Sequence, residues 1–440
     1  MRPQRILVVG SGGREHALAW RLARDPGGPE VLAAPGNEGM ERVARRLPVG
    51  ELDDAGLAEA CRREAVDLVV VGPEAPLAAG LADRLEAAGV LVYGPGREAA
   101  RLESSKWFAK EVMRAAGVPT AAAEPFEDVD AARRALGRRG PPWVVKADGL
   151  AAGKGVLVSS DRAEAEAFLE ACLAGGRFGA GGRRVLIEEH LAGEEVSVMA
   201  VCDGRDWVLL PPARDYKRAF DGDRGPNTGG MGAFAPSERL DAQGEEEVGR
   251  AVVGPVLREL ERRGTPFRGT LYCGLMLTGS GPRVVEFNVR FGDPETQVVL
   301  PLVGGDLGAL LAGAARGSLD RGAVGREPGS AVAVALADEG YPADVRGGGR
   351  IGGLERLEER GDVMVFHAAT RREADGWRVH GGRAAYVAAR GVTRAVARER
   401  VYGALASLDG DGWRARRDVA AEAAGGATGD GPEGRSDGGA

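Results

Sequence analysis

Apolar runs and helical stretches alternate along the first part of the chain, from residue 1 to about residue 103. Each apolar run ends in Gly or Pro. The expected strands are residues 5–10, 30–35, 67–72 and 90–94, and the expected helices are residues 14–24, 54–65 and 76–89. This alternation predicts βαβ units, hence a parallel sheet with helices on both faces. Loops at the carboxyl ends of its strands form the expected ligand edge.

Helices and strands mix in the next part, from about residue 104. A helix is expected at residues 104–117, with Ser104 or Ser105 as its N-cap and Gly117 as its stop. A strand, a glycine loop and a second strand are expected over residues 141–160. The other expected elements are helices at 161–175 and near 243–264, strands at 183–191, 194–204, 269–279 and 282–291, and a long polar loop at 211–236.

Short strands return from about residue 327, at residues 329–337, 362–370 and 382–391, and predict a mostly β domain. The last residues, 422–440, lack apolar content and are expected to be disordered. A chain of 440 residues suggests about three domains.

The charge balance and the cysteines narrow the classes of function. A net charge of −7 gives no general attraction to nucleic acid or to an anionic membrane, so neither is an expected partner. No run approaches the roughly 18–20 apolar residues of a membrane span, and the N-terminus shows no signal-peptide pattern. The four scattered cysteines are expected to be buried free thiols in a reducing cytoplasm, rather than metal ligands or catalytic groups.

Lysine is rare in this chain. There are 53 arginines but only five lysines: Lys106, Lys110, Lys146, Lys154 and Lys217. A compact ammonium acts as a point charge on phosphate, which a planar guanidinium does differently. We infer that lysine is kept where arginine does not serve, although drift could also leave a few lysines anywhere.

The stretch VVGSGGREHA lacks one residue of a dinucleotide-binding turn. The GxGxxG pattern counted from Gly10 needs glycine where Glu15 stands. The turn still places backbone N–H groups at a helix N-terminus, which suits a single phosphate. A tight turn without a ligand is the structural alternative, and His16 is expected to form hydrogen bonds rather than to act as a base.

The stretch KADGLAAGKGV is a glycine loop, with Lys146 entering it and Lys154 inside it. It is not a P-loop, because only three residues separate Gly149 from Gly153 and because Gly155 replaces the Ser or Thr that would hold magnesium. Such a loop can fold over a triphosphate and provide backbone donors with an ammonium. A Gly-rich surface hairpin is the alternative.

Two weaker signals lie near this loop. Residues 186–195, LIEEHLAGEE, alone indicate a charged hairpin rim. Beside a phosphate loop, the backbone near His190 and Leu191 could instead bind an adenine edge, and a following carboxylate could bind ribose hydroxyls. Lys106 lies in an amphipathic helix, either as a phosphate ligand or on a solvated face.

Residues 284–297, VVEFNVRFGDPETQ, carry the strongest local signal. In a strand, Glu286, Asn288 and Arg290 share one face, with apolar residues on the other. Glu and Asn oxygens at this spacing can hold one hard cation, and magnesium often shares such ligands with substrate phosphates. Arg290 can hold a phosphate or a carboxylate. A buried, paired structural network is the alternative.

Together these residues resemble the ATP-grasp ligases, and more closely the phosphoribosylamine–glycine ligase family, over about residues 1–421. The motifs in the family's order are GSGGREHA, APGNEG, VGPEAPL, SKWFAKEVM, KADGLAAGKGV, DYKRAFDGDRGPNTGGMGAFAP and EFNVRFGDPETQ. The resemblance implies an α/β and α+β multidomain fold. Its parts would be a pre-ATP-grasp parallel α/β domain (1–103), ATP-grasp lobes (104–325, small lobe about 122–192) and a small β-rich C-terminal domain (326–421).

The resemblance also implies the site residues. The implied ATP-binding residues are Lys106, Lys146, Gly153, Lys154, Gly155, Glu188, Leu191 and Glu194. The implied metal ligands, for Mg²⁺ or Mn²⁺, are Glu286 and Asn288. The implied catalytic residues are Arg290, Asp293, Asp215 and Lys217, without a decision on a general base. The implied substrate-binding residues are Gly12, Gly13, Asn37, Gly39, Pro73, Glu74, Asp215, Lys217, Arg218, Gly230 and Met231.

The implied reaction joins glycine to 5-phosphoribosylamine through glycyl phosphate, with ATP cleaved to ADP and phosphate, in purine biosynthesis. The family-level expectation is a monomer with small-molecule partners only. The chain departs from the family in ARDYKR, where QDHKR is commoner, so Arg214 and Tyr216 change the hydrogen bonding of that loop. The rival functions are another ATP-grasp carboxylate–amine ligase and a nucleotide-binding regulator without turnover.

Overall fold

The computed structural model describes residues 2–151 and 153–421. The tail predicted to be disordered, residues 422–440, lies outside the described residues. No helix in the described ranges is long and apolar enough to cross a membrane.

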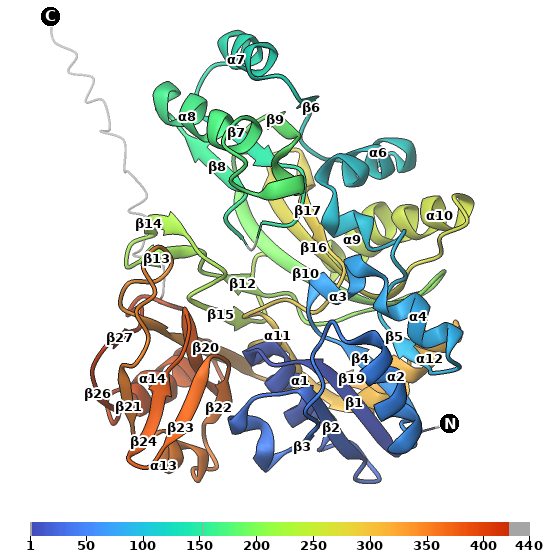
Figure 1. Cartoon of the computed structure of the whole chain (residues 1–440), viewed down its shortest axis with the longest axis vertical. Helices are drawn as coiled ribbons and strands as arrows, with labels where there is room; N and C mark the ends of the chain where they lie inside the picture. The colour runs from blue at the N-terminus through green and yellow to red at the C-terminus, as the bar shows by residue number, and fades with distance from the viewer. Residues whose placement is uncertain (1, 152, 422–440) are drawn as a thin grey trace, which may run out of the picture.

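A five-stranded parallel sheet forms the N-terminal part, in the order β3-β2-β1-β4-β5 (Figure 1). Its strands are β1 (Arg5–Gly10), β2 (Glu30–Pro35), β3 (Arg45–Arg46), β4 (Leu68–Val71) and β5 (Val92–Tyr93). Its helices are α1 (Gly13–Leu22), η1 (Glu38–Arg42), α2 (Asp54–Arg63), α3 (Glu74–Ala79) and α4 (Leu81–Ala87). The predicted parallel sheet is confirmed. The helix predicted over residues 76–89 is divided because Gly80 adopts a left-handed φ of 89°.

Both faces of this sheet are buried, as the continuous apolar runs predict. Successive side chains of β1 alternate between two cores, with Leu7 and Val9 in one and Ile6 and Val8 in the other. The first core extends to residues 196–202 and 271–289, and the second extends to residues 331–335 of the C-terminal part. The N-terminal sheet therefore packs against both of these parts of the chain.

A small lobe stands above the rest of the molecule in Figure 1. Its antiparallel sheet has the order β6-β9-β7-β8, from β6 (Ala123–Phe126), β7 (Trp143–Ala147), β8 (Val156–Ser159) and β9 (Val185–Glu188). The helices α7 (Val129–Arg138) and α8 (Arg162–Leu173) cover it around a separate core, and η2 (Gly179–Gly182) precedes β9. The sequence pattern missed β6 and α7.

A second antiparallel sheet, called the central sheet below, lies beneath the small lobe, in the order β11-β10-β16-β17. Its strands are β10 (Glu194–Asp203), β11 (Trp207–Leu209), β16 (Arg268–Thr278) and β17 (Gly281–Asn288). The helices that precede or follow its strands in the chain are α5 (Arg101–Ser104), α6 (Lys106–Ala116), α9 (Ala242–Val248), the π-helical η3 (Gly249–Val253), α10 (Gly254–Arg262), α11 (Thr296–Val299), η4 (Leu300–Leu302) and α12 (Leu307–Arg316). As predicted, Ser105 caps α6 and Gly117 ends it in a left-handed conformation.

The polar stretch at residues 211–236 is not a simple loop, which corrects the sequence prediction. It contains four short strands: β12 (Arg214–Asp215), β13 (Arg218–Phe220), β14 (Arg224–Asn227) and β15 (Gly232–Ala235). The fully buried β15 pairs with β20 of the C-terminal part, almost one hundred residues later in the chain. Such a partner cannot be found from local periodicity. We call residues 211–236 the acceptor loop below, after the role that the family resemblance implies for them.

The C-terminal part is mostly β, as predicted, and its main sheet has the order β12-β15-β20-β25-β22 with β27 beside β20. Of these strands, β20 (Ser330–Asp338), β22 (Met364–His367), β25 (Arg383–Gly391) and β27 (Trp413–Arg414) come from the C-terminal part. A second sheet has the order β23-β24-β21-β26, from β21 (Arg350–Gly352), β23 (Thr370–Glu373), β24 (Gly376–Val379) and β26 (Asp409–Gly410). The helices are α13 (Leu354–Glu358) and α14 (Arg394–Leu405), and a separate hairpin joins β18 (Val303–Gly305) to β19 (Val324–Arg326).

Candidate active site

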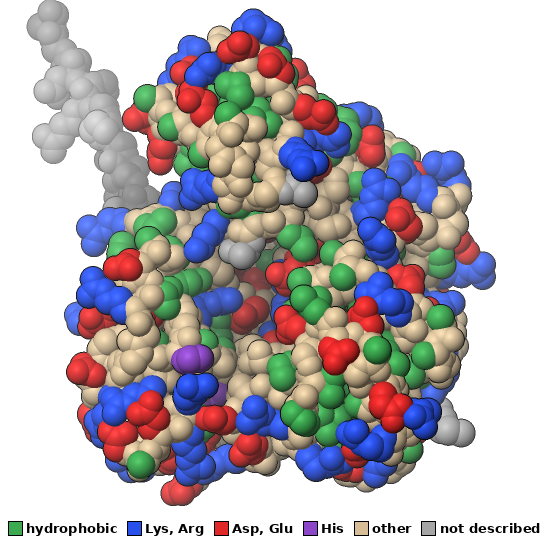
Figure 2. All heavy atoms as spheres, in the orientation of Figure 1, with side chains coloured by type: hydrophobic (Ala, Val, Ile, Leu, Met, Phe, Trp, Pro, Cys, Tyr) green, Lys and Arg blue, Asp and Glu red, His purple; other side chains and the backbone are tan. Residues whose placement is uncertain are grey.

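A hollow opens near the centre of the face shown in Figure 2, between the small lobe and the body below it, and both acidic and basic side chains are visible in it. The predicted site residues come from the small lobe, from the central sheet, from the acceptor loop and from the turns at the edge of the N-terminal sheet. The C-terminal part contributes as well.

Two lysines flank one buried carboxylate at the end of β9. The Lys146 Nζ lies 2.8 Å from the Glu188 Oε2, and the Lys110 Nζ lies 3.3 Å from the Glu188 Oε1. Their side chains are only 2–4% exposed. Lys146 also donates a hydrogen bond to the Val285 carbonyl at 3.1 Å, next to Glu286 on β17. The Lys146 ammonium therefore bridges the small lobe and the central sheet.

Lys110 had no predicted role, yet it is buried and has three polar partners. Its ammonium donates to the Thr120 Oγ1 at 2.9 Å and to the Ala121 carbonyl at 3.0 Å. Burial lowers the pKa of Lys110 to about 8, against the opposing effect of the Glu188 carboxylate. Lys110 thus fixes the carboxylate that holds Lys146.

Lys106, the first residue of α6, contacts the glycine loop. Its Nζ donates to the Gly149 carbonyl at 3.1 Å, and its backbone N–H donates to the Asp148 carbonyl at 3.0 Å. Burial lowers the pKa of the Lys106 ammonium, and the nearby Glu286 carboxylate opposes that shift. Lys106 therefore lies within electrostatic reach of the predicted metal ligand.

The end of the glycine loop reaches the acceptor loop. A methyl group placed on Gly153 would lie 3.6 Å from the Thr228 carbonyl oxygen, and Gly153 has a φ of 75°. The Lys154 backbone N–H donates to the Ala151 carbonyl at 2.9 Å, and a methyl group on Gly155 would lie 2.6 Å from the Ala151 Cβ. The loop is therefore folded back toward the site, with no room for a side chain at Gly155.

The two remaining ATP candidates are Leu191, in the loop after β9, and Glu194, the first residue of β10. A cavity of about 400 Å³ is lined by residues 139–143 and 188–190, and Leu191 is the next residue in the chain. The Glu194 Oε2 is 2.8 Å from the Arg239 Nε and 3.6 Å from an Arg214 nitrogen. One departure from the family pattern, Arg214, thus contacts a predicted ribose-binding residue.

Glu286 and Asn288 lie on β17, opposite Gly274 and Tyr272 of β16. Both side chains are partly exposed, and no group of three or more His, Cys, Asp or Glu within residues 2–151 and 153–421 could hold a metal ion. Two oxygen donors on one strand, beside Lys106, suit a hard cation that completes its shell with substrate oxygens. The residues present therefore fit the implied magnesium or manganese.

Arg290 does not continue the strand, which corrects the predicted strand at residues 282–291. The strand ends at Asn288, because the next backbone N–H donates to the Glu103 carboxylate at 2.8 Å rather than to β16. The Arg290 guanidinium donates to Glu103 at 2.9 Å and lies 3.5 Å from Glu74. Although burial favours the neutral form, these two carboxylates raise the pKa of Arg290. Arg290 is held between the N-terminal part and β17.

Three ionisable groups meet where the acceptor loop crosses β10. The Lys217 ammonium donates to the Glu195 carboxylate. Burial raises the pKa of Asp215 to about 7, against the effect of Lys217 and with the help of Glu295 and Glu195. The pKa of Lys217 is raised despite burial, because Asp215 and Glu195 stabilise its charge. This cluster provides a cation and a carboxylate that titrates near neutral pH.

Other predicted residues of the acceptor loop have structural contacts. Arg218 donates to the Gly225 carbonyl at 2.7 Å within the hairpin of β13 and β14. Met231 is buried, and its N–H donates to the Tyr216 carbonyl at 2.7 Å. The Tyr216 hydroxyl accepts a hydrogen bond from the Ala420 N–H at 2.9 Å, so this departure ties the loop to the C-terminal segment.

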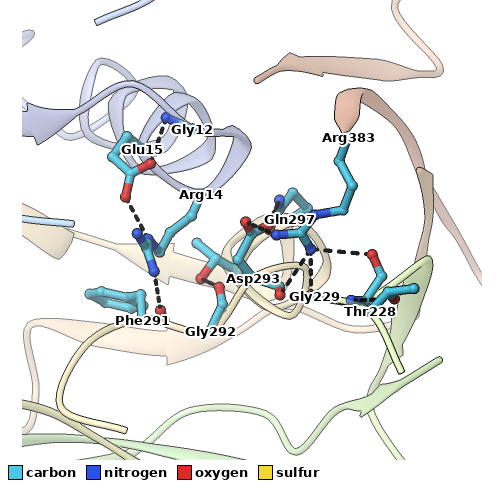
Figure 3. Close-up of polar contacts among 12 residues, drawn as sticks. Gly12, Arg14, Glu15, Thr228, Gly229, Phe291, Gly292, Asp293, Gln297 and Arg383 are labelled. Carbon is cyan, nitrogen blue, oxygen red and sulfur yellow. Dashed lines mark hydrogen bonds and ion pairs between the residues drawn. The ribbon is translucent and has the colours of Figure 1, made fainter. Parts of the chain in front are cut away.

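Asp293 is held by side chains from two parts of the chain (Figure 3). Its Oδ1 accepts from the Gln297 Nε2 at 2.7 Å, and its Oδ2 lies 2.9 Å from the Arg383 Nη2. Burial disfavours the charged form, but Arg383 and Arg14 outweigh it and lower the pKa of Asp293. An ionised, paired carboxylate is a weaker base than Asp215.

The turn at Gly12 and Gly13 is held by Glu15, the residue that stands where a dinucleotide-binding motif has glycine. The Gly12 N–H donates to the Glu15 Oε2 at 2.8 Å, and the Arg14 Nε donates to the Glu15 Oε1 at 2.5 Å. A methyl group on Gly13 would lie 2.6 Å from the Tyr386 ring. The turn is therefore braced internally and packed against the C-terminal part.

The turn after β2 also contacts the C-terminal part. The Asn37 Nδ2 donates to the Ser11 carbonyl at 2.7 Å and to the His367 carbonyl at 2.9 Å. A methyl group on Gly39 would lie 2.2 Å from the His367 ring. His16, as expected, forms a hydrogen bond: its Nδ1 accepts from the His367 N–H at 2.9 Å, and burial lowers its pKa to about 3.

The last two N-terminal candidates lie at the start of α3. Pro73 is the residue before the helix, and Glu74 is its first residue. Glu74 faces Arg290, as described above, and Arg14 lies 3.9 Å from the same carboxylate oxygen. The edge of the N-terminal sheet is thus linked to the turn that follows β17.

Four residues that hold predicted site residues in place were not predicted from the sequence: Lys110, Glu195, Glu103 and Arg383. Only Lys110 carried a signal, as one of five lysines. The others are common charged residues, and their partners lie far away in the chain.

Family comparisons agree with this architecture. Residues 4–103, 104–296 and 331–422 match, in turn, the N domain, the ATP-grasp (A) domain and the C domain of phosphoribosylglycinamide synthetase. A biotin carboxylase domain of Hydrogenobacter thermophilus has a similar fold, with a TM-score of 0.70 at 19% identity over 94% of this chain and 92% of that one. The fold and the matched central domain define an ATP-grasp enzyme.

Comparisons with individual relatives identify the family within the ATP-grasp enzymes. The chain is 47% identical to the phosphoribosylamine–glycine ligase of Caulobacter vibrioides, covering 94% of this chain and 97% of the relative. It is also 47% identical to that of Streptomyces coelicolor, covering 96% and 100%. The crystal structure of the Thermotoga maritima ligase matches with a TM-score of 0.82 at 35% identity, covering 94% and 99%. The chain belongs to the phosphoribosylamine–glycine ligase family, a family of carbon–nitrogen ligases, and the resemblance inferred from its motifs is confirmed.

Proposed function

We propose that this protein ligates glycine to 5-phosphoribosylamine in purine biosynthesis, with ATP as co-substrate and glycyl phosphate as the intermediate. The observation that carries the proposal is that Lys146 donates to the Val285 carbonyl, beside Glu286 on β17, while Lys106 donates to the glycine loop at Gly149. Burial lowers the pKa of Lys106, and the Glu286 carboxylate opposes that shift. Cations beside an oxygen-ligand strand suit a nucleoside triphosphate.

The first step would be phosphoryl transfer, for which positioning and charge neutralisation provide most of the catalysis. A glycine carboxylate oxygen attacks the γ-phosphorus, and ADP leaves. Lys106 and Lys146 would bind the phosphates, and the glycine loop would exclude water from the acyl phosphate. Glu286 and Asn288 would hold Mg²⁺ or Mn²⁺, which neutralises charge on the transferred group.

The second step would form the amide. The amine of phosphoribosylamine attacks the acyl carbon, phosphate leaves, and the nitrogen loses a proton. Asp215 is a better acceptor for this proton than Asp293, because its pKa is raised to about 7 while that of the Arg383-paired Asp293 is lowered. Lys217 would hold the glycine carboxylate or its phosphorylated form close to Asp215.

Two measurements test the proposal. Release of ADP should require both glycine and freshly made phosphoribosylamine, and other carboxylates should not replace glycine. With glycine labelled by ¹⁸O in its carboxyl group, one labelled oxygen should appear in the released phosphate, because the C–O bond of the acyl phosphate breaks. Unlabelled phosphate would refute the intermediate, and equal turnover with another carboxylate would indicate a different ligase.

Several further properties belong to this proposal. The substrates would be the only partners, and a monomer in the cytoplasm is proposed. The four cysteines, all buried and free, agree with a reducing compartment. The choice between Mg²⁺ and Mn²⁺ would follow from a comparison of turnover with each cation.

A further inference from the structure

The C-terminal part carries no predicted site residue, yet one of its arginines enters the site. Arg383 is the first residue of β25, and its guanidinium lies among the turns at residues 228–231 and 292–297 (Figure 3). The side chain is only 18% exposed. A buried guanidinium needs partners for its donors, so its contacts reveal what it holds.

Within the described residues, each side-chain hydrogen bond of Arg383 goes to one of these two turns. The Nη1 donates to the Gly229 carbonyl, to the Gly230 carbonyl at 3.2 Å and, more weakly, to the Asp293 carbonyl at 3.4 Å. The Nη2 donates to the Asp293 Oδ2 at 2.9 Å. One planar group thus joins the acceptor loop to the turn after β17. A lysine could not reproduce this pattern, because its ammonium lacks the planar fork.

Two glycines make this close approach possible. A methyl group on Gly229 would lie 2.8 Å from the Arg383 Cζ, and one on Gly230 would lie 2.3 Å from the Pro294 Cδ. Gly230 also has a φ of 108°, which other residues rarely adopt. The sequence of the acceptor loop therefore leaves room for the guanidinium and for the neighbouring turn.

The contacts continue from Arg383 to the ionisable cluster. The Gly230 N–H donates to the Thr228 Oγ1 at 3.0 Å, and that hydroxyl donates to the Lys217 carbonyl at 2.8 Å. A second C-terminal residue supports the same loop, since the Tyr341 hydroxyl accepts from the Gly229 N–H at 2.9 Å. Loss of the Arg383 contacts would release the loop segment that ends at Lys217.

We propose that Arg383 is a positioning residue through which the C-terminal part sets the geometry of the site for glycine and phosphoribosylamine, without a role in ATP binding. The inference rests on the proposed function, because it names the two substrates whose use depends on Arg383. It separates two sites within one enzyme: the nucleotide site between the lobes, and the site for the other substrates where the C-terminal part meets the acceptor loop.

The test compares Arg383→Gln and Arg383→Lys with the wild-type protein and with Arg378→Gln. Arg378 is a matched control, because it lies in the same part of the chain on β24 and pairs with Glu373 at 3.1 Å and Asp375 at 2.7 Å. For each protein, kcat/KM is measured separately for glycine and phosphoribosylamine, and ATP affinity is measured by calorimetry. Wild-type ligation is established first, so failure of the proposed function is seen before any variant is compared.

For Arg383→Gln we expect kcat/KM for glycine and phosphoribosylamine to fall by about 100-fold, the effect typical of a small misplacement of reacting groups. ATP affinity should stay within about threefold of the wild type, as should all parameters of Arg378→Gln. Arg383→Lys should recover only part of the loss, since its ammonium can pair with Asp293 but cannot bridge all the carbonyls.

Three results would overturn the inference. They are wild-type kcat/KM in Arg383→Gln, an equal loss of ATP affinity, or full recovery in Arg383→Lys. If Arg383→Gln does not fold, Arg383→Lys alone tests the inference. If Arg383 provided only a positive charge for stability, lysine would replace it, and kcat/KM for glycine and phosphoribosylamine would stay at the wild-type value.

Discussion

Burial disfavours the charged form of Asp215, and removing that charge should stabilise the protein at pH 8 while it impairs the enzyme. Burial raises the pKa of Asp215 from 3.8 to about 7; Lys217 opposes the rise, and Glu295 and Glu195 add to it. A rise of about 3 in pKa corresponds to about 4 kcal/mol in the free energy of unfolding. We therefore expect Asp215→Asn to be more stable than the wild type at pH 8.

The sign of the pH dependence follows from proton linkage. Because the pKa is raised on folding, the folded protein binds more protons than the unfolded chain between about pH 4 and pH 7. The contribution of Asp215 to stability is therefore fully present below pH 3.8 and is lost as the pH rises through 7. The free energy of unfolding of Asp215→Asn should thus exceed that of the wild type only slightly at pH 4.5 and by about 4 kcal/mol at pH 8. Lys217 should remain paired to Glu195 in the variant.

The assay is thermal unfolding of both proteins at the two pH values, together with glycine kinetics. Asp375→Asn is the control, because Asp375 is exposed and pairs with Arg378 at the surface. Activity of Asp215→Asn should fall by about 100-fold, so that the variant is more stable but less active than the wild type. The reasoning would be refuted if Asp215→Asn were less stable than the wild type at pH 8, or if its gain in stability were the same at both pH values.

Three other predictions concern the nucleotide and metal sites. Asn288→Ala should keep the fold and lose most turnover, because one of the two proposed oxygen ligands is removed; wild-type activity across a magnesium titration would contradict the assignment. Lys146→Arg should bind ATP more weakly, since a guanidinium cannot replace the ammonium 2.8 Å from Glu188, and calorimetry with unchanged affinity would count against a direct phosphate contact. Glu188→Gln should lower the free energy of unfolding by about 3–5 kcal/mol, because Lys146 and Lys110 then lack their buried partner; an unchanged unfolding midpoint would show that neither lysine depends on it.

Local patterns predicted much of the fold. Strands β1 and β2 begin and end where the apolar runs do, because continuous burial on both faces imposes such a run. The Ser105 cap and the Gly117 stop of α6 were also predicted, since a cap depends on residues next to the helix end. The end of β17 was not, because the group that terminates it, Glu103, comes from another element.

The sequence by itself determined the kind of chemistry: the rare lysines, the glycine loop and the Glu-Asn pair on one strand already indicated a nucleotide and metal site. Only the tertiary structure decided which charges face one another. Glu188 pairs with Lys110 across 78 positions and Asp293 with Arg383 across 90, while β15 joins a sheet almost one hundred residues away. Periodicity and caps depend on neighbours in the chain, whereas ion pairs and strand partners depend on distances in space that no local pattern records.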